Sequence, residues 1–227
     1  MPERLSGTVT FLFTDIEGST ALLKRLGRAR YGDLLARQQV LLREAFAARS
    51  GEEIDTQGDS FFVAFRSASD AVAAAVAIQR SLGDHEWPDG VEVRVRIGIH
   101  SGEASAAGEG YVGFSVHRAA RIGAAAHGGQ VLISDSTRTL VEDDLAPGVF
   151  LRDLGVFRLK DVDRPERISQ VAAEGLRVQF PPLRGADTDA NAEVMPLGIA
   201  ADERFGENNQ LGTLACGIRR EVSKFLK

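Results

Sequence analysis

The order of apolar segments in the first hundred residues constrains the fold of this chain more than any other feature. Short apolar or alternating runs typical of strands are separated by longer segments with the 3.6-residue spacing of amphipathic helices. Strands are predicted at residues 8–14, 52–56, 60–65 and 91–100, and helices at residues 19–49 and 67–82. The first helix is expected to break near Gly27 and Gly32, and Ser67 is a suitable N-cap for the second.

This strand–helix–strand–strand–helix–strand order matches the split βαβ, or ferredoxin-like, arrangement, so an α+β fold is predicted. Right-handed crossovers place the third strand between the first and the second, antiparallel to both. The end of the first strand then lies beside the start of the third. Asp15 closes the first strand and Asp59 immediately precedes the third, so the topology brings two carboxylates to one corner of the sheet.

Two carboxylates in one corner can bind hard divalent cations, which prefer oxygen ligands. The residues after Asp15 lead into a helix, whose free backbone N–H groups can hold phosphate. These residues are Ile16, Glu17, Gly18, Ser19 and Thr20. Together the two features predict a nucleoside triphosphate site. The ordinary alternative is that Asp15 only caps the helix and Asp59 only serves a turn.

The second half of the chain predicts a further helix and an extra small β region. Residues 102–111 are rich in small residues and are expected to form a loop, and residues 112–126 a helix on which His117 and Arg121, four apart, share a face. Further strands are predicted at residues 130–134, 149–151, 156–159 and 168–171, with a short helix at 135–141. Beyond residue 174 the pattern weakens into a linker at 179–184, and the spacing near 214–225 is compatible with one helix.

Composition excludes several classes of protein. A chain of 227 residues with 44% hydrophobic content can bury one good-sized core, and a net charge of −5 argues against a general nucleic-acid binder. The longest apolar run, residues 71–78, is too short to span a bilayer, and the first residues lack an apolar signal core. The single cysteine, Cys216, allows no intramolecular disulfide. A cytoplasmic protein without nucleic-acid or membrane partners is therefore expected.

Four segments together resemble the catalytic domain of class III adenylate and guanylate cyclases. They are FLFTDIEGST at residues 11–20, GDSFF at 58–62, RIGIHSG at 96–102 and the segment 111–122, which begins with YVG. They occur in order and with family-like spacing over residues 5–174, which is far more specific than one motif alone. A catalytic domain at 5–174 and a linker with a C-terminal extension at 175–227 are therefore expected.

In the resembled family, two aspartates bind two divalent ions that bridge the triphosphate. The ions activate the ribose 3′-hydroxyl for attack on the α-phosphate, and pyrophosphate leaves. The resemblance assigns these positions to Asp15 and Asp59 and adds the Ile16 carbonyl as a further ligand. It implies an enzyme of intracellular signalling that uses two Mg²⁺ or Mn²⁺ ions per site and makes a 3′,5′-cyclic nucleotide from ATP or GTP.

The resemblance also assigns residues to the triphosphate and the ribose. Arg121, eight residues after Gly113, matches the family arginine that stabilises charge on the transferring phosphoryl group. The family usually has asparagine, which positions the ribose, where His117 stands, and a histidine ring nitrogen can donate one hydrogen bond. Lys160 resembles the family lysine on the triphosphate. Ordinary surface roles for these three side chains are the alternative.

Base recognition departs from the adenylate pattern of the family, which has lysine where Asp55 stands and aspartate or threonine where Gly110 stands. A carboxylate can accept two hydrogen bonds from guanine, whereas lysine can accept none. The pair therefore resembles the guanylate pattern, although the guanylate acid is usually glutamate. A solvated Asp55 and a hinge at Gly110 are the alternative, so ATP and GTP both stay open.

The resemblance finally implies a head-to-tail homodimer, since in the family one chain gives the metals and the other gives the arginine. The expected partners are thus a nucleoside triphosphate and a second copy of the chain. The residues Asp55, Gly110 and His117 favour a different function, a cyclase-fold domain of little activity that senses nucleotides or mediates dimerisation.

Overall fold

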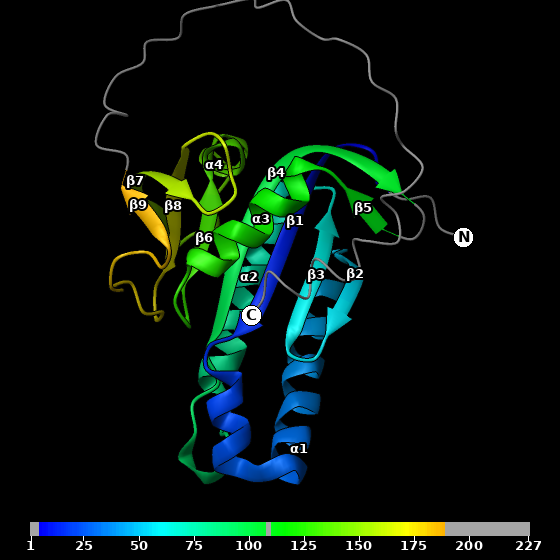
Figure 1. The fold of residues 1–227 in the computed structure, drawn as a ribbon, viewed down its shortest axis with the longest axis vertical. Helices are drawn as coiled ribbons and strands as arrows, with labels where there is room; N and C mark the ends of the chain where they lie inside the picture. The colour runs from blue at the N-terminus through cyan, green and yellow to red at the C-terminus, as the bar shows by residue number, and fades with distance from the viewer. Residues whose placement is uncertain (1–4, 108–109, 189–227) are drawn as a thin grey trace, which may run out of the picture.

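One mixed sheet of nine strands forms the centre of the molecule (Figure 1). The computed structural model describes residues 5–107 and 110–188. Along the sheet the strands follow the order β2-β3-β1-β4-β6-β8-β7-β9, and β5 pairs with β4 alone. The strands are β1 (Gly7–Ile16), β2 (Glu52–Gln57), β3 (Ser60–Phe65), β4 (Val95–Ala107), β5 (Gly110–Val112), β6 (Val131–Ser134), β7 (Val149–Leu159), β8 (Glu166–Ala173) and β9 (Ala186–Thr188).

The helices cover both faces of this sheet. They are α1 (Ser19–Ala47), α2 (Ala68–Asp84), α3 (Phe114–Ala125) and α4 (Asp135–Val141), and a short 3₁₀ turn spans Pro88–Gly90. The largest apolar cluster lies between one sheet face and α1, α2 and α4, with Leu42 and Ile78 among its fully buried members. On the other face α3 packs against β4 and β1, and the rings of Phe13 on β1 and Phe62 on β3 stack at 4.5 Å. No helix in the described ranges is long and apolar enough to cross a membrane.

The ferredoxin-like core is confirmed. β3 lies between β2 and β1 and is antiparallel to both. Thr14 near the end of β1 pairs with Phe61 near the start of β3, as the predicted topology requires. The α2 cap is also confirmed, because the Ser67 side chain accepts a hydrogen bond from the Asp70 N–H.

Helix α1 breaks at one of the two predicted glycines. Gly27 has φ 76° and ψ 169°, a conformation accessible almost only to glycine. Figure 1 shows α1 as two arms, the second of which returns towards the sheet. The break predicted near Gly32 is wrong, because the helix continues through that residue. The return brings the second arm of α1 alongside the corner that holds the two aspartates.

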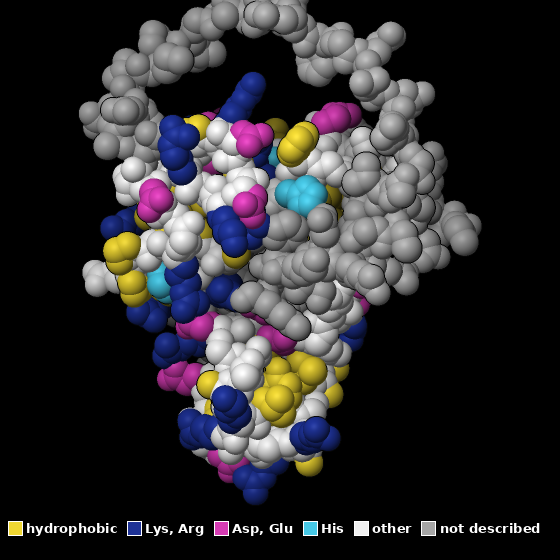
Figure 2. All heavy atoms as spheres, in the orientation of Figure 1, with side chains coloured by type: hydrophobic (Ala, Val, Ile, Leu, Met, Phe, Trp, Pro, Cys, Tyr) yellow, Lys and Arg dark blue, Asp and Glu magenta, His cyan; other side chains and the backbone are white. Residues whose placement is uncertain are grey.

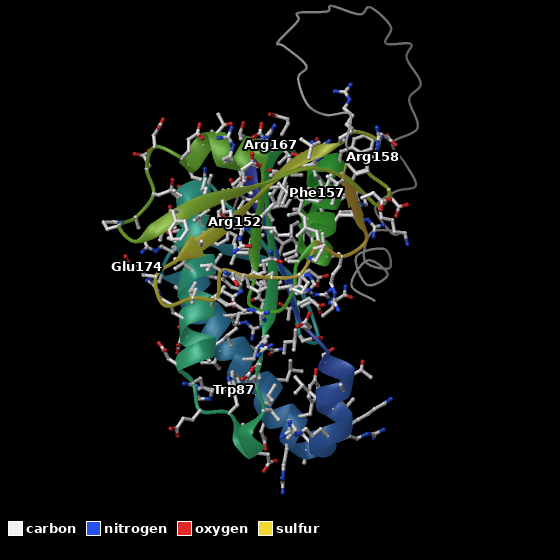
Figure 3. The ribbon with its side chains drawn as sticks, turned by 90° about the vertical axis from the view of Figure 1, so that its left-hand side faces the viewer. Trp87, Arg152, Phe157, Arg158, Arg167 and Glu174 are labelled. Atoms are coloured by element: carbon white, nitrogen blue, oxygen red, sulfur yellow. The ribbon has the colours of Figure 1, made fainter. Side chains whose placement is uncertain are left out.

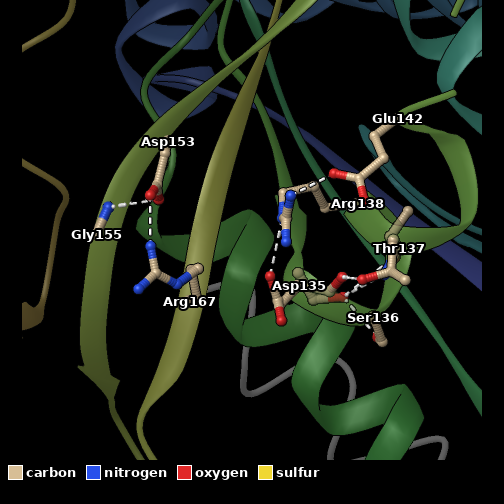
Figure 4. A network of polar contacts seen from close by, with 10 residues as sticks. Asp135, Ser136, Thr137, Arg138, Glu142, Asp153, Gly155 and Arg167 are labelled. Atoms are coloured by element: carbon tan, nitrogen blue, oxygen red, sulfur yellow. Dashed lines mark hydrogen bonds and ion pairs between the residues drawn. The ribbon is translucent and has the colours of Figure 1, made fainter. Parts of the chain in front are cut away.

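Two predicted segments differ from the structure. The loop expected at residues 102–111 is wrong, because β4 continues to Ala107 and pairs with β5, and small side chains do not prevent such pairing. The strands expected at 149–151 and 156–159 are one strand, β7, whose register shifts between Asp153 and Gly155. The Gly155 N–H donates to Asp153 at this bulge, and Asp153 pairs with Arg167 on β8 (Figure 4).

The extra β region belongs to the same sheet. β6 pairs in parallel with β4, and β8, β7 and β9 extend the sheet from there. The last described strand, β9, follows a segment expected to be a linker, and pairs with the end of β7. The helix suggested near residues 214–225 lies outside the described residues.

Candidate functional site

Asp15 and Asp59 lie together at one corner of the sheet, as the topology predicts. The Asp59 Oδ2 atom accepts a hydrogen bond of 3.2 Å from the Ile16 N–H. In return, the Asp15 Oδ1 atom accepts one of 3.1 Å from the Ser60 hydroxyl. The residue that follows each aspartate thus binds the other aspartate, and these two bonds hold both carboxylates at the same place.

The electrostatics of this corner favour a cation. Burial, and then the charge of Asp15, raise the pKa of the Asp59 carboxyl, although hydrogen bonds from Ser19 and Ile16 oppose the shift. Tyr31, on the returning arm of α1, also has a raised pKa, because of its burial and the negative charges of Asp59 and Asp15. Negative charge in a partly desolvated corner is unfavourable until a cation compensates it.

In the described structure the compensating cation for Asp15 is Arg96. The two residues are register partners on β1 and β4, and their side chains form an ion pair in which the Arg96 side chain is only 17% exposed. The alternation of residues 91–100 indicates only that Arg96 lies on one face of its strand. The prediction from sequence missed this contact, since the pairing register of β1 and β4 was needed to find it.

The turn that carries Asp59 is fastened by two glutamines of α1, which sequence reasoning also missed. The fully buried Gln38 donates from Nε2 to the Asp59 carbonyl at 3.5 Å, and Gln39 donates to the Gly58 carbonyl at 2.8 Å. Gly58 itself has φ 61°, which suits glycine. The sequence hints at this role only by placing two adjacent glutamines among the apolar residues of the helix that covers the sheet.

The β1–α1 turn supplies backbone N–H groups at the start of α1. Gly18 caps the helix in a left-handed conformation (φ 72°) without a side-chain cap, and Ser19 and Thr20 begin the first turn. The first N–H groups of a helix have no intrahelical acceptor, so this end can receive an anion. Glu17 is engaged elsewhere: its N–H donates to the Arg94 carbonyl at 2.8 Å, and its carboxylate pairs with Arg184 at 3.1 Å.

The residues of α3 point to a different place. Arg121, whose side chain is 11% exposed, pairs with Asp161, and burial lowers its pKa. Asp161 follows Lys160, which is exposed, so the turn after β7 brings the predicted lysine near the predicted arginine. His117 lies one turn earlier on α3 and is partly buried. Figure 2 shows Lys and Arg side chains gathered towards the β7–β9 side of this face.

The side of α3 that faces Asp15 carries small residues instead. Ala120, Gly123 and Ala124 line a hollow of about 10 Å³ together with Asp15 and Arg96. The structure therefore brings together Asp15, Ile16 and Asp59 at one corner, whereas Arg121 forms its ion pair with Asp161, next to Lys160.

The two predicted base-reading positions lie on neighbouring segments. A Cβ atom at Gly110 would lie 4.0 Å from the Ile54 side chain, one residue before Asp55. Both carboxylate oxygens of Asp55 already accept hydrogen bonds, from the Thr56 N–H and from the Gln57 amide, each at 2.9 Å. Any base read by Asp55 therefore has to displace the Gln57 amide or share the carboxylate with it.

Comparison with known proteins gives a consistent result. The model of the adenylate and guanylate cyclase catalytic domain matches residues 1–160. An uncharacterized protein of Mycobacterium tuberculosis is 38% identical over 183 residues, which cover 80% of this chain and 61% of that relative. The receptor-type adenylate cyclase B of Leishmania donovani is 31% identical over 196 residues, which cover 68% of this chain and 15% of that protein. The chain thus spans less than two thirds of the length of these relatives.

Solved structures show the same fold. An adenylate cyclase of Trypanosoma brucei, determined in its monomeric state, superposes with a TM-score of 0.71 at 26% identity and covers 81% of this chain and 95% of that chain. The guanylate cyclase domain of Catenaria anguillulae in complex with GTP gives a TM-score of 0.66 at 21% identity. The superposition covers 75% of this chain and 99% of that domain. At this identity the second likeness concerns the fold alone.

Proposed function

The chain belongs to the class III adenylate and guanylate cyclase family, and from this premise we propose that it is a nucleotidyl cyclase. It converts a nucleoside triphosphate, ATP or GTP, to a 3′,5′-cyclic nucleotide and pyrophosphate for intracellular signalling. The observation that carries the proposal is the corner in which Asp15 and Asp59 are bound reciprocally through Ser60 and Ile16, beside a helix N-terminus.

The donor set of this corner fits two Mg²⁺ or Mn²⁺ ions. Asp15, Asp59 and the Ile16 carbonyl are hard oxygen donors, and Mg²⁺ is commonly held by one or two carboxylates together with substrate phosphates. The raised pKa of Asp59, caused first by burial and then by the charge of Asp15, is a further reason to expect cations here. When bound, the ions neutralise the triphosphate and favour ionisation of the ribose 3′-hydroxyl.

The side chains of the chain would act around that reaction. The 3′-hydroxyl would pass its proton to water, and the 3′-oxygen would form a bond to the α-phosphorus while the bond to the bridging oxygen breaks and pyrophosphate leaves. Arg121 would stabilise the charge on the α-phosphate oxygens, His117 would orient the ribose, and Lys160 would bind the triphosphate. Arg96, which pairs with Asp15 in the described structure, would be a further cation within the site for phosphate oxygens.

The site would be shared between two chains in a head-to-tail homodimer. Within one chain Arg121 is paired with Asp161, and small residues of α3 face Asp15. A second copy would therefore have to bring its own Arg121, His117 and Lys160 to the carboxylates of the first. The resulting homodimer has two equivalent sites.

A second candidate is a weakly active or inactive domain that senses nucleotides or mediates dimerisation. The engagement of both Asp55 oxygens and the histidine at position 117 favour it. Incubation of the purified protein with each of the four nucleoside triphosphates and Mn²⁺, followed by mass spectrometry, separates the two functions. Formation of a cyclic nucleotide supports the cyclase, and nucleotide binding without any cyclic product contradicts it.

A further inference from the structure

The segment of residues 175–185, here named the strap, lies beyond the region that matches the family model and crosses the molecule after β8. Figure 3 shows it running below Arg152 in that view before it rises into β9. We propose that Arg184 of this strap is a positioning residue for the triphosphate site. It holds the Glu17 carboxylate away from the N–H groups that receive phosphate, and the proposal rests on the function given above.

The strap is fixed at its start by buried amides. The Val178 carbonyl accepts hydrogen bonds from Gln170 at 3.0 Å and from Arg152 at 3.5 Å. The Gln170 side chain accepts in turn from Gln130 at 3.0 Å, and both glutamines are 2% exposed. Hydrogen bonds of this kind are costly to break, because a buried polar group would be left unpaired.

The middle of the strap is fixed to the end of α3. The His127 ring stacks on Phe180, with centroids 6.4 Å apart, and its Nε2 atom hydrogen-bonds the Pro182 carbonyl at 2.9 Å. The Arg184 N–H donates to the Ala125 carbonyl at 3.0 Å, which satisfies one of the acceptors left free at a helix C-terminus. These contacts fix the position of the Arg184 backbone independently of the contacts of its side chain.

The Arg184 side chain then reaches the turn that enters α1. Its NH1 atom lies 3.1 Å from Oε1 of Glu17, whose side chain is 28% exposed. Glu17 also packs against the Gly128 backbone: a Cβ atom there would lie 2.7 Å from Oε2 and 2.9 Å from Cβ of Glu17. A side chain at position 128 would therefore have to displace Glu17 and also Arg94, whose Cβ atom would lie 2.7 Å away.

The position of Glu17 affects an incoming triphosphate. A carboxylate is favourable at a helix N-terminus, so a released Glu17 can compete for the N–H groups of the first turn of α1 and also repels phosphate. Arg184 prevents both effects, because it neutralises the carboxylate and draws it towards the strap. Loss of Arg184 should therefore weaken triphosphate binding without altering the groups that act on the α-phosphate.

The test compares Arg184→Ala and Arg184→Gln with Arg184→Lys and with the double variant Glu17→Gln/Arg184→Ala in the full chain. For Arg184→Ala and Arg184→Gln we expect the KM of the triphosphate to rise roughly two- to fivefold with kcat unchanged, and Arg184→Lys to restore it. The double variant should recover a low KM, because the competing charge is gone. If Arg184 only stabilises the strap, the double variant should have the same raised KM as Arg184→Ala.

Arg177→Ala is the matched control, since Arg177 belongs to the same strap but lies over the Phe180 ring at 4.7 Å and donates to the Gln179 carbonyl at 2.8 Å. It should leave KM unchanged. The same variants are titrated, in the presence of Mn²⁺, with a fluorescent triphosphate whose blocked 3′-hydroxyl cannot cyclise, so that binding is measured even if the wild type makes no cyclic product. Equal KM and equal dissociation constants in wild type and Arg184→Ala would overturn the proposal, whereas absent turnover would count only against the cyclase.

Discussion

At the scale of single residues, Asp59 is held where its charge is unfavourable. Burial and the charge of Asp15 raise its pKa, so the ionised form costs stability at neutral pH. Asp59→Asn removes the charge and can still accept the hydrogen bond from Ile16. We expect this variant to melt at a higher temperature and to lose Mn²⁺-dependent turnover by at least about a hundredfold. Calorimetry and product assays measure the two effects on one preparation.

Asp15 is less suitable for the same test, because it is also structural. Its carboxylate is buried and pairs with Arg96, so removal leaves an uncompensated guanidinium and costs roughly 3 kcal/mol or more. Loss of activity in Asp15→Ala therefore does not distinguish a lost metal ligand from a damaged fold. Wild-type turnover in Asp59→Asn would contradict the metal assignment directly.

The exchange of Asp55 to lysine with Gly110 to aspartate tests base recognition. It replaces an acceptor by a donor at one position and adds an acceptor on the neighbouring segment, beside Ile54. Sites built on hydrogen bonds discriminate strongly against mismatched partners, so relative turnover should shift towards ATP by about tenfold or more. Unchanged relative rates across the four triphosphates would show that these two positions do not read the base.

His100 predicts a pH dependence of stability. Burial, and then the charge of Arg118, lower its pKa to about 4, and its Nδ1 atom hydrogen-bonds Ser134 at 2.8 Å. The unfolded chain binds the proton first on acidification, so stability is complete above pH 6.5 and falls by roughly 3 kcal/mol towards pH 4. Burial raises the pKa of Glu166, so protonation of this residue on acidification increases stability and opposes the effect of His100. The free energy of unfolding in urea is measured against pH for wild type and for His100→Asn, and the difference between the two isolates the contribution of the histidine. If the two free energies change with pH in parallel, the predicted contribution of His100 is wrong.

At the scale of elements, α3 is held against β4 by two glycines. A Cβ atom at Gly98 would lie 2.1 Å from the Gly123 nitrogen and 2.8 Å from the Ala119 carbonyl oxygen, so backbone would have to move. We expect Gly98→Ala to cost roughly 3 kcal/mol and to reduce turnover, because α3 carries Arg121. Gly32→Ala, with no atom within 4 Å of the new methyl group, should instead stabilise the protein by up to about 1 kcal/mol. Similar melting temperatures for the two variants would contradict this packing.

The sequence predicts those elements whose periodicity and topology agree. The first six elements, their order and the corner of Asp15 and Asp59 follow from the pattern and from handedness. The β4–β5 hairpin does not, because small residues carry no alternation and their pairing depends on a partner strand. The single strand β7 is concealed by a bulge whose polar residues resemble a turn. Contacts such as those of Arg96 and Arg184 depend on register and on a segment without periodicity, and no local pattern encodes them.

At the scale of the whole molecule, the separation of the two half-sites predicts complementation. Asp59→Asn removes the metal half-site, and Arg121→Ala removes the half-site on α3, so each homodimer should be inactive. When equal amounts exchange subunits, half of the dimers are mixed, and each mixed dimer has one site with both defects and one with neither. About a quarter of wild-type activity should then return. Failure to recover activity after demonstrated exchange would place both residues in a site within one chain.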